Sequence, residues 1–192
     1  MTKEIYFVTG NPGKFEEIKT YIESNVPEIK LKQFTADIVE IQTLDQKEIV
    51  IDKALKAWEM LKKPLIVDDG AMYFEKYNKF PGIMSKYVAE GIGFEGLKKL
   101  VDDGDKATFI LYIAYIDSPE NIRLFEGKTS GTIKKPAKFN GHPKLQYSSM
   151  FIPNGIDKFY SELRNTKEGE PFMHRIKALK SFINWYKPQA AL

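Results

Sequence analysis

The segment Thr9-Gly10-Asn11-Pro12-Gly13-Lys14 contains residue types that bind phosphate. It lies between a β-branched and aromatic run at residues 5–9, which predicts a strand, and a helical pattern that starts at Lys14. Glycines let backbone N–H groups converge on an anion, a helix N-terminus is partly positive, and Lys14 adds a full charge. The spacing differs from the Walker A motif. An ordinary strand–helix connection is the alternative interpretation.

A second candidate is the carboxylate pair Asp68-Asp69, which follows the apolar run Leu65-Ile66-Val67. The run predicts a short buried strand that ends at the pair. Adjacent carboxylates repel each other unless a cation or hydrogen bonds compensate, so the pair indicates a metal site. Successive side chains of a strand point to opposite faces, so we expect only one of the two to face a given ligand. An exposed turn that carries a helix cap is the alternative.

Other polar residues carry weaker signals. Glu48 and Lys53 lie on a predicted helix over residues 44–61, close in sequence to Glu40. A charged helix face is most often simply solvated. His174-Arg175 stands near the start of a predicted helix over 171–186, where a single histidine is most often a surface or capping residue. None of these signals identifies a function alone.

Composition narrows the chemistry. The 192 residues include no cysteine and two histidines, His142 and His174, which excludes disulfides, thiol nucleophiles, cysteine-based zinc sites and multi-histidine metal centres. The carboxylates, amines and hydroxyls that remain favour a hard cation such as Mg²⁺.

The net charge of +3 is too small to imply a nucleic-acid binder. No apolar run approaches the roughly 20 residues of a membrane span. A strand pattern directly after Met-Thr-Lys-Glu leaves no room for a signal peptide, so we expect a cytoplasmic protein.

The order of the elements predicts the fold class. Strand and helix patterns alternate in the first part of the chain, and two long β-like runs follow at residues 107–116 and 122–135. The short polar segment between these runs predicts a hairpin, so part of the sheet is antiparallel. A short helix near 94–101 and a short strand near 149–152 complete the pattern. We expect one α/β domain with a mixed sheet.

Taken together and in order, these motifs resemble the inosine triphosphate pyrophosphatase family. Thr9–Lys14 with Glu17 is similar to the family's Thr-Gly-Asn-x-x-Lys-x-x-Glu loop, and Asp68-Asp69 is similar to its Asp-Asp-Ser-Gly-Leu motif. The resemblance covers nearly the whole chain in collinear order. Its other segments are Glu40-Ile41-Gln42, Glu48, Lys53-Ala54, Pro81-Gly82, Phe125-Glu126-Gly127, Phe151–Gly155, Glu162-Leu163, Lys167 and His174-Arg175.

The chain also departs from the family pattern. Gly70 stands where the family has a serine, and Met173 replaces the serine before His-Arg. The Phe-Gly-Tyr/Trp-Asp motif of the base pocket is replaced by Leu145-Gln146-Tyr147-Ser148. Lys167 precedes His174 by seven residues, where about five are usual. The phosphate and metal half therefore matches better than the half that reads the base.

The resemblance implies a long twisted mixed β-sheet flanked by helices, with two lobes and a central cleft, as a single pyrophosphatase domain over residues 1–192 in a homodimer. It implies Mg²⁺-dependent hydrolysis of non-standard purine nucleoside triphosphates (ITP, dITP and XTP) to the monophosphate and pyrophosphate, which keeps them out of nucleic acids. Glu40 and Asp69 would hold the Mg²⁺, and Asp69, with Asp68 in support, would activate water. Lys14 and Lys53 would clamp phosphate oxygens. The implied substrate-binding residues are Thr9, Gly10, Asn11, Pro12, Gly13, Lys14, Gly70, Tyr147, Ser148, Lys167, His174 and Arg175.

Three alternatives stay open. The first is a divergent pyrophosphatase with broad or different triphosphate specificity, and the second is a nucleotide-binding homologue with little catalysis. The third, single-stranded nucleic-acid binding, would rest on 13% aromatic residues and a pI near 8.8. It lacks a basic stripe with interleaved aromatics. We expect a nucleoside triphosphate as the partner, and neither a stable nucleic-acid partner nor a membrane.

Overall fold

The structure is a computed structural model that describes residues 3–139 and 145–190. It divides into two compact units. The first contains the described parts of residues 1–69, 111–127 and 178–192, and the second contains those of residues 70–110 and 128–177.

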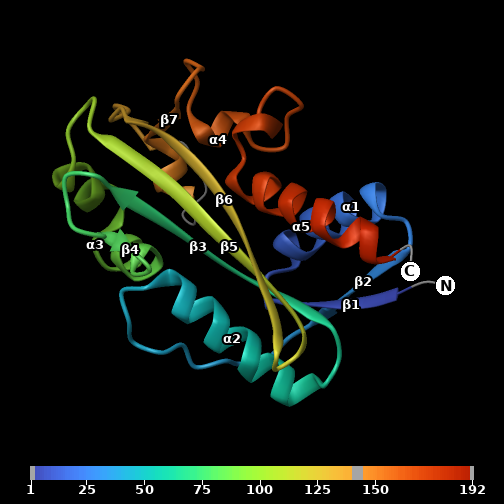
Figure 1. The fold of residues 1–192 in the computed structure, drawn as a ribbon. Coiled ribbons are helices and arrows are strands. Elements are labelled where there is room, and N and C mark those ends of the chain that lie inside the picture. The colour runs from blue at the N-terminus through green and yellow to red at the C-terminus, as the bar shows by residue number, and fades with distance from the viewer. Residues whose placement is uncertain (1–2, 140–144, 191–192) are drawn as a thin grey trace. The chain divides into compact units, whose positions relative to one another are not determined.

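Figure 1 shows the elements along the chain. The strands are β1 (Lys3–Val8), β2 (Ile29–Phe34), β3 (Leu65–Phe74), β4 (Pro81–Gly82), β5 (Lys106–Ser118), β6 (Asn121–Ile133) and β7 (Phe151–Pro153). The helices are α1 (Pro12–Asn25), α2 (Gln46–Leu61), α3 (Ser85–Leu100), α4 (Tyr160–Leu163) and α5 (His174–Ala190), with short 3₁₀ helices at Tyr147–Ser149 and Glu170–Phe172.

The strands form one mixed sheet in the order β2-β1-β3-β5-β6-β7, and β4 pairs with β3. Strand β1 is parallel to both β2 and β3, whereas β4 and β7 run antiparallel to β3 and β6. Two residues connect β5 to its neighbour β6, which makes the predicted hairpin. The sheet is open, and the predicted α/β class with a mixed sheet is confirmed.

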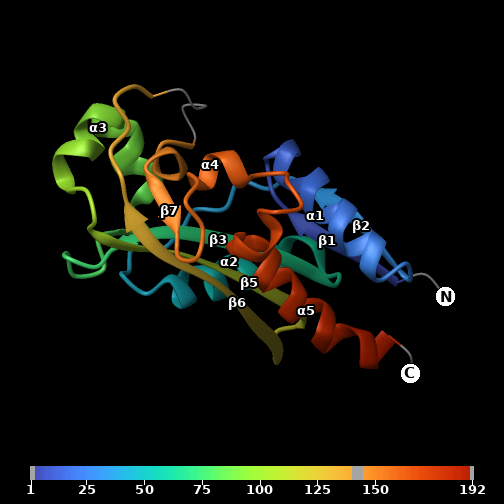
Figure 2. The ribbon, with the colours of Figure 1, turned by 90° about the horizontal axis from the view of Figure 1, so that it is seen from above.

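In the first unit, helix α1 starts where turn chemistry and apolar periodicity agree. The Asn11 side chain caps the helix by accepting a hydrogen bond from the Lys14 backbone N–H at 3.1 Å. Phe15, Ile18 and Ile22 recur at helical spacing and are buried. Because this face packs against β2 (Figure 2), the loop that precedes α1 is held at the end of β1.

Helix α2 is placed in the same way. The Asp45 carboxylate caps it by accepting from the Lys47 backbone N–H at 2.8 Å. Its buried face consists of Gln46, Ile49, Val50, Ala54 and Ala57. It ends at Lys62, whose φ of 51° is left-handed. The predicted helix over 44–61 is confirmed except for its first two residues.

The second unit has its own apolar core. Residues from β3, α3, β7 and α4 meet there, and they include Met72, Phe74, Leu97, Phe151 and Tyr160. Helix α3 contains a break at Gly93, where φ is 63° and ψ is −177°. The short helix predicted over 94–101 corresponds to the part after this break. The part before it has no sequence prediction.

Two expectations need correction. Strand β3 does not end at the Asp68-Asp69 pair but continues to Phe74, because Ala71, Met72 and Phe74 are buried and Met72 pairs with Gly82 of β4. The predicted strand at 149–152 is shifted to Phe151–Pro153. Among the described residues, no helix is long and apolar enough to cross a membrane. The cleft between two lobes stays a prediction.

Candidate functional site

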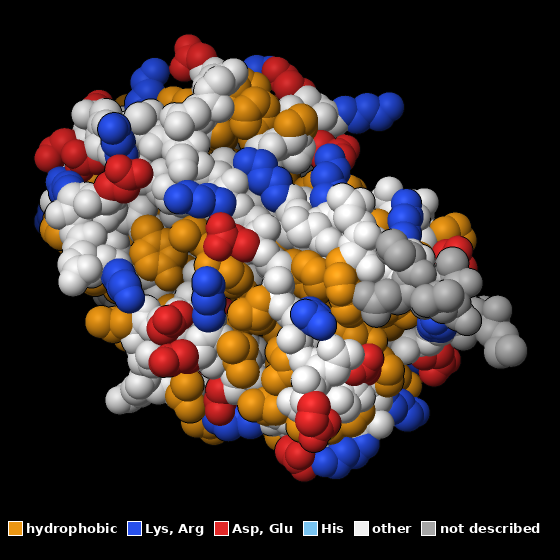
Figure 3. Space-filling view, viewed as in Figure 1, with side chains coloured by type: hydrophobic (Ala, Val, Ile, Leu, Met, Phe, Trp, Pro, Cys, Tyr) orange, Lys and Arg blue, Asp and Glu red, His pale blue; other side chains and the backbone are white. Residues whose placement is uncertain are grey.

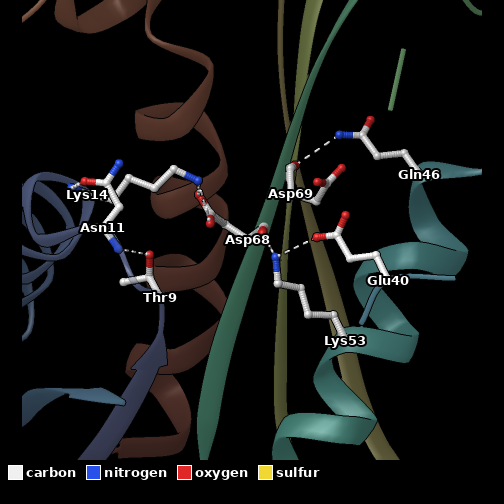
Figure 4. A network of polar contacts seen from close by, with 8 residues as sticks. All are labelled: Thr9, Asn11, Lys14, Glu40, Gln46, Lys53, Asp68 and Asp69. Carbon is white, nitrogen blue, oxygen red and sulfur yellow. Dashed lines mark hydrogen bonds and ion pairs between the residues drawn. The ribbon is translucent and has the colours of Figure 1, made fainter. Parts of the chain in front are cut away.

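The two adjacent carboxylates of β3 lie on opposite sides of the strand (Figure 4), as strand alternation predicts. Asp68 is only 4% exposed, and both of its carboxylate oxygens accept from Lys14 Nζ, at 3.1 and 3.2 Å. On the other side, the Gln46 amide donates to the Asp69 carbonyl oxygen at 3.0 Å. The two carboxylates therefore have different surroundings.

The Asp69 carboxylate has an unusual environment. Its Oδ2 atom is buried and has no hydrogen-bond partner among the described residues. Burial raises the pKa of this carboxyl above its usual value, and the nearby charges of Asp68 and Glu40 act in the same direction. A hydrogen bond from Gln46 and the positive charge of Lys53 act against that rise. A bound cation would stabilise the ionised form further.

Lys53 links the irregular segment after β2 to strand β3. Its ammonium donates to Glu40 Oε1 at 3.2 Å and to the Asp68 carbonyl oxygen at 3.4 Å. Glu40 and Lys53 lie on the same side of β3 as Asp69 (Figure 4). The Lys53 ammonium thus holds the Glu40 carboxylate beside strand β3, which carries the carboxylates of Asp68 and Asp69.

The Thr9–Gly13 loop is held by its own polar side chains. The Asn11 backbone N–H donates to Thr9 Oγ1 at 3.1 Å, and the Gln33 amide donates to the Thr9 carbonyl oxygen at 2.8 Å. Pro12 takes the first position of α1, where no backbone donor is needed. The side chains of Thr9 and Asn11 stabilise the turn, and the backbone N–H groups at the start of α1 mark the anion-binding end of the helix.

A pocket of about 190 Å³ lies within the first unit. This volume is below the roughly 300 Å³ of a pocket for a drug-sized molecule, so it suits a smaller group such as a phosphate. Sequence reasoning missed Ala36, Asp37 and Ile38, for which the only signal was an acidic residue in a segment without periodicity. The pocket is lined by Val8, Thr9, Gly10, Lys14, Ala36, Asp37, Ile38, Glu40, Lys53 and Asp68.

The remaining predicted site residues belong to the second unit. Tyr147 is buried in the core, where its hydroxyl donates to the Ser85 carbonyl oxygen at 2.9 Å. Ser148 is buried beside it in the same 3₁₀ helix, and Lys167 and Gly70 are exposed. His174 and Arg175 begin α5 and are half-buried. The structure thus gathers Lys14, Glu40, Lys53, Asp68 and Asp69 in the first unit and places Gly70, Tyr147, Ser148, Lys167, His174 and Arg175 in the second.

A capped helix N-terminus, two lysines and several carboxylates lie around one small pocket, and groups of these types suit a phosphate group and a cation. The family model of the Ham1 family matches residues 5–185, and the chain belongs to this family. The chain is 34% identical over 190 residues to the dITP/XTP pyrophosphatase of Methanopyrus kandleri, which covers 98% of both chains. It is 32% identical over 155 residues to the inosine triphosphate pyrophosphatase of Kluyveromyces lactis, covering 79% of this chain and 78% of that one.

Solved structures support the fold. The Ham1 protein of Staphylococcus aureus aligns with a TM-score of 0.77 at 24% identity, covering 97% of this chain and all of that one. A HAM1 protein from Coxiella burnetii aligns with a TM-score of 0.78 at 22% identity, with the same coverage. The family resemblance is therefore confirmed, and so is the prediction of a hydrolase of the nucleoside-triphosphate pyrophosphatase class.

Proposed function

We propose that the chain is a Mg²⁺-dependent enzyme that hydrolyses non-standard purine nucleoside triphosphates (ITP, dITP and XTP) to the monophosphate and pyrophosphate, and so keeps them out of nucleic acids. It acts as a cytoplasmic homodimer. The observation that carries the proposal is the group of Lys14, Glu40, Lys53 and Asp68 around one pocket, with Asp69 next in the chain on the side of β3 that faces Glu40. The names of relatives that align with nearly the whole chain support the substrate class.

The donor set fits Mg²⁺. Within residues 3–139 and 145–190, no three acidic or histidine side chains form a closed metal cage. Mg²⁺ is usually bound by one or two carboxylates together with water and substrate phosphates, and it needs no such cage. Glu40 and Asp69 would hold it, and the buried Oδ2 of Asp69 is an acceptor to which no described residue donates. When bound, the ion offsets the negative charge that builds on the phosphate oxygens.

The chain's own residues supply binding and positioning. Lys14 and Lys53 bind phosphate oxygens, and the backbone donors at the start of α1 bind a further oxygen. Asp69, with Asp68 in support, orients a water molecule and accepts its proton. The water oxygen bonds to the α-phosphorus as the bond from that phosphorus to the bridging oxygen breaks, and pyrophosphate leaves with the bridging oxygen. Phosphoryl transfer depends mostly on positioning and charge stabilisation, which these residues provide.

We assign the recognition of the base to residues of the second unit. Lys167, His174 and Arg175 are donors that would face the 6-oxo group of the base. Gly70, Tyr147 and Ser148 are the other residues of this unit that the family resemblance assigns to substrate binding. A buried donor forms a hydrogen bond with the 6-oxo oxygen, but it has no acceptor when it faces the 6-amino group of adenine. The lost hydrogen bond lowers the rate of hydrolysis of adenine nucleotides. Ser148 stands where the family motif has a carboxylate, which is the reason to keep broad specificity as the second candidate function.

The test is pyrophosphate release with Mg²⁺ from ITP, XTP, GTP, ATP and CTP. We expect fast release from ITP and XTP, and loss of at least about a hundredfold in Asp69→Asn. Asp157→Asn, at an exposed position, is the matched control and should keep full activity. Equal release of pyrophosphate from all five triphosphates would contradict the proposed preference for ITP and XTP and would support broad specificity. No release from folded protein would leave a nucleotide-binding homologue.

The face drawn in Figure 3 gives no support to the nucleic-acid alternative. On the face drawn in Figure 3, lysine and arginine side chains are interspersed with aspartate and glutamate. A protein that follows a nucleic-acid backbone needs a continuous basic groove with aromatic platforms. Binding of oligonucleotides that weakens strongly with salt would be required to support that alternative.

A further inference from the structure

The hydroxyl of Thr129 links strand β6 to the chain just before helix α5. Thr129 is 3% exposed, and its hydroxyl donates to the Phe172 carbonyl oxygen at 2.6 Å. A carbonyl oxygen can only accept, so the single proton of the hydroxyl is directed at Phe172. Lys177 Nζ donates to the same hydroxyl oxygen at 3.1 Å. The Thr129 hydroxyl therefore joins two points of the chain, one on each side of the start of α5.

These two points flank His174 and Arg175, the pair that the proposed function places at the base. Phe172 lies two residues before His174, and Lys177 lies two residues after Arg175. Lys177 Nζ also donates to the Lys128 carbonyl oxygen at 2.9 Å. All of these residues belong to the second unit. The chain on each side of His174-Arg175 is thus attached to the same strand, β6.

Other hydrogen bonds just before α5 are local. The backbone N–H groups of Phe172 and Met173 donate to carbonyl oxygens three residues earlier, at 2.9 and 3.2 Å. These bonds shape the 3₁₀ helix, whereas the Thr129 bond joins residues 43 positions apart. The Met173 side chain packs against the apolar core of the second unit. A polar contact with β6 and an apolar contact with the core therefore hold the chain that leads into His174.

We propose that Thr129 is a positioning residue that fixes the place of His174 and Arg175, and that it thereby supports the preference for 6-oxo bases. The inference rests on the proposed function, in which both residues face the base. Without the hydroxyl, the chain before α5 can shift relative to β6. A small shift weakens hydrogen bonds to the 6-oxo oxygen, because their strength depends steeply on distance and angle. Bonds to the phosphate groups, which we assign to the first unit, should keep their strength.

The first test measures the attachment without substrate. Amide hydrogen exchange of the full chain is compared in Thr129→Val, which removes the hydroxyl, and in Thr129→Ser, which keeps it. We expect exchange of the Lys177 backbone N–H, which donates to the Met173 carbonyl oxygen at 3.1 Å, to become about threefold to tenfold faster in Thr129→Val, the range for one hydrogen bond. Thr129→Ser should exchange at the wild-type rate. An unchanged rate in Thr129→Val would overturn the proposal.

The matched control is Thr108→Val. Thr108 is 5% exposed on β5, and its hydroxyl forms a hydrogen bond with the Ser130 hydroxyl of β6 at 3.1 Å. The control therefore makes the same substitution at a buried position of the same sheet, and the bond that it breaks is not to the chain around α5. We expect the exchange rate of the Lys177 N–H to stay at the wild-type value.

The second test measures selectivity. We expect kcat/KM for ITP relative to ATP to fall about threefold to tenfold in Thr129→Val and to be restored in Thr129→Ser. GTP should follow ITP because it also carries a 6-oxo group. Inhibition by pyrophosphate, which reports on the phosphate side, should be the same in Thr129→Val as in the wild type. Thr108→Val should leave the ITP/ATP ratio unchanged.

A merely structural role for the Thr129 hydroxyl gives a different result. General loosening would lower kcat/KM for ITP, GTP and ATP together, and an unchanged ratio in Thr129→Val would overturn the proposal. Failure of the proposed function is distinguishable from this outcome, because it would appear as absence of turnover in the folded wild-type protein. The exchange measurement would then still show whether Thr129 fixes the chain around His174 and Arg175.

Discussion

The ion pair between Lys14 and Asp68 should contribute far more to stability than the ion pairs at the surface. Lys14 Nζ lies 3.1 and 3.2 Å from the two Asp68 oxygens, with the carboxylate 4% and the lysine side chain 33% exposed. Removing one partner of a fully buried pair costs about 3 to 5 kcal/mol, whereas exposed pairs contribute about 1 kcal/mol or less. Because only the carboxylate is buried, we expect Lys14→Met to lower the free energy of unfolding by about 2 kcal/mol.

Urea denaturation at neutral pH measures this, with Asp68→Asn and the double variant completing a mutant cycle. We expect a coupling energy of about 1 to 2 kcal/mol between the two sites. The control is Lys158→Met, which breaks an exposed pair with Glu168 at 2.6 Å and should cost less than about 1 kcal/mol. A Lys14→Met loss no larger than that of Lys158→Met, or a coupling energy near zero, would refute the reasoning.

Three further predictions concern the second unit. Ion pairs with Lys135 and Lys76 lower the pKa of Asp102, and the ion pair with Lys76 lowers the pKa of Asp105, both from the usual 3.8. The stability that these pairs contribute is present above that pH and is lost as the pH falls through the lowered values. Lys76→Met should therefore move the acid-unfolding midpoint to higher pH, as circular dichroism would show, and an unchanged midpoint would contradict this. Gly131→Ala places a methyl group 2.1 Å from a carbonyl oxygen of β7, so chemical denaturation should show a loss of about 2 to 4 kcal/mol. Tyr147→Phe loses a buried hydrogen bond and should lower stability by about 1 kcal/mol; unchanged stability would contradict this contribution of the hydroxyl.

Local sequence signals located the elements that hold the phosphate side of the site. Capping by Asn11 and apolar spacing at Phe15, Ile18 and Ile22 define α1, and a similar pattern defines α2. The first part of α3 escaped prediction because Gly91 and Gly93 interrupt its periodicity. The full length of β3 also escaped, because pairs of aspartates normally favour turns, and here tertiary pairing overrides that preference.

Partnerships between side chains depend on distances that local patterns do not encode. Lys14 and Asp68 lie 54 positions apart, and their contact exists because β1 pairs with β3. Strand alternation correctly separated the two aspartates. By contrast, no sequence signal paired Tyr160 with His174, because a tyrosine at the start of a short helix is most simply explained by core packing. Asp37 was missed because the irregular segment that carries it is placed by the surrounding fold.

Because Asp68 and Asp69 face opposite sides of β3, the site depends on the number of residues in the strand before them as well as on their identity. Each residue of the strand faces the side opposite to its neighbour, so inserting or deleting one residue between Leu65 and Asp68 would exchange the two surroundings. The carboxylate now paired with Lys14 would turn toward Gln46 and Glu40, and the other would turn toward α1. The flanking apolar residues, which pair in register with β1, resist such a slip. The number of residues between Leu65 and Asp68 therefore constrains the site independently of which residues they are.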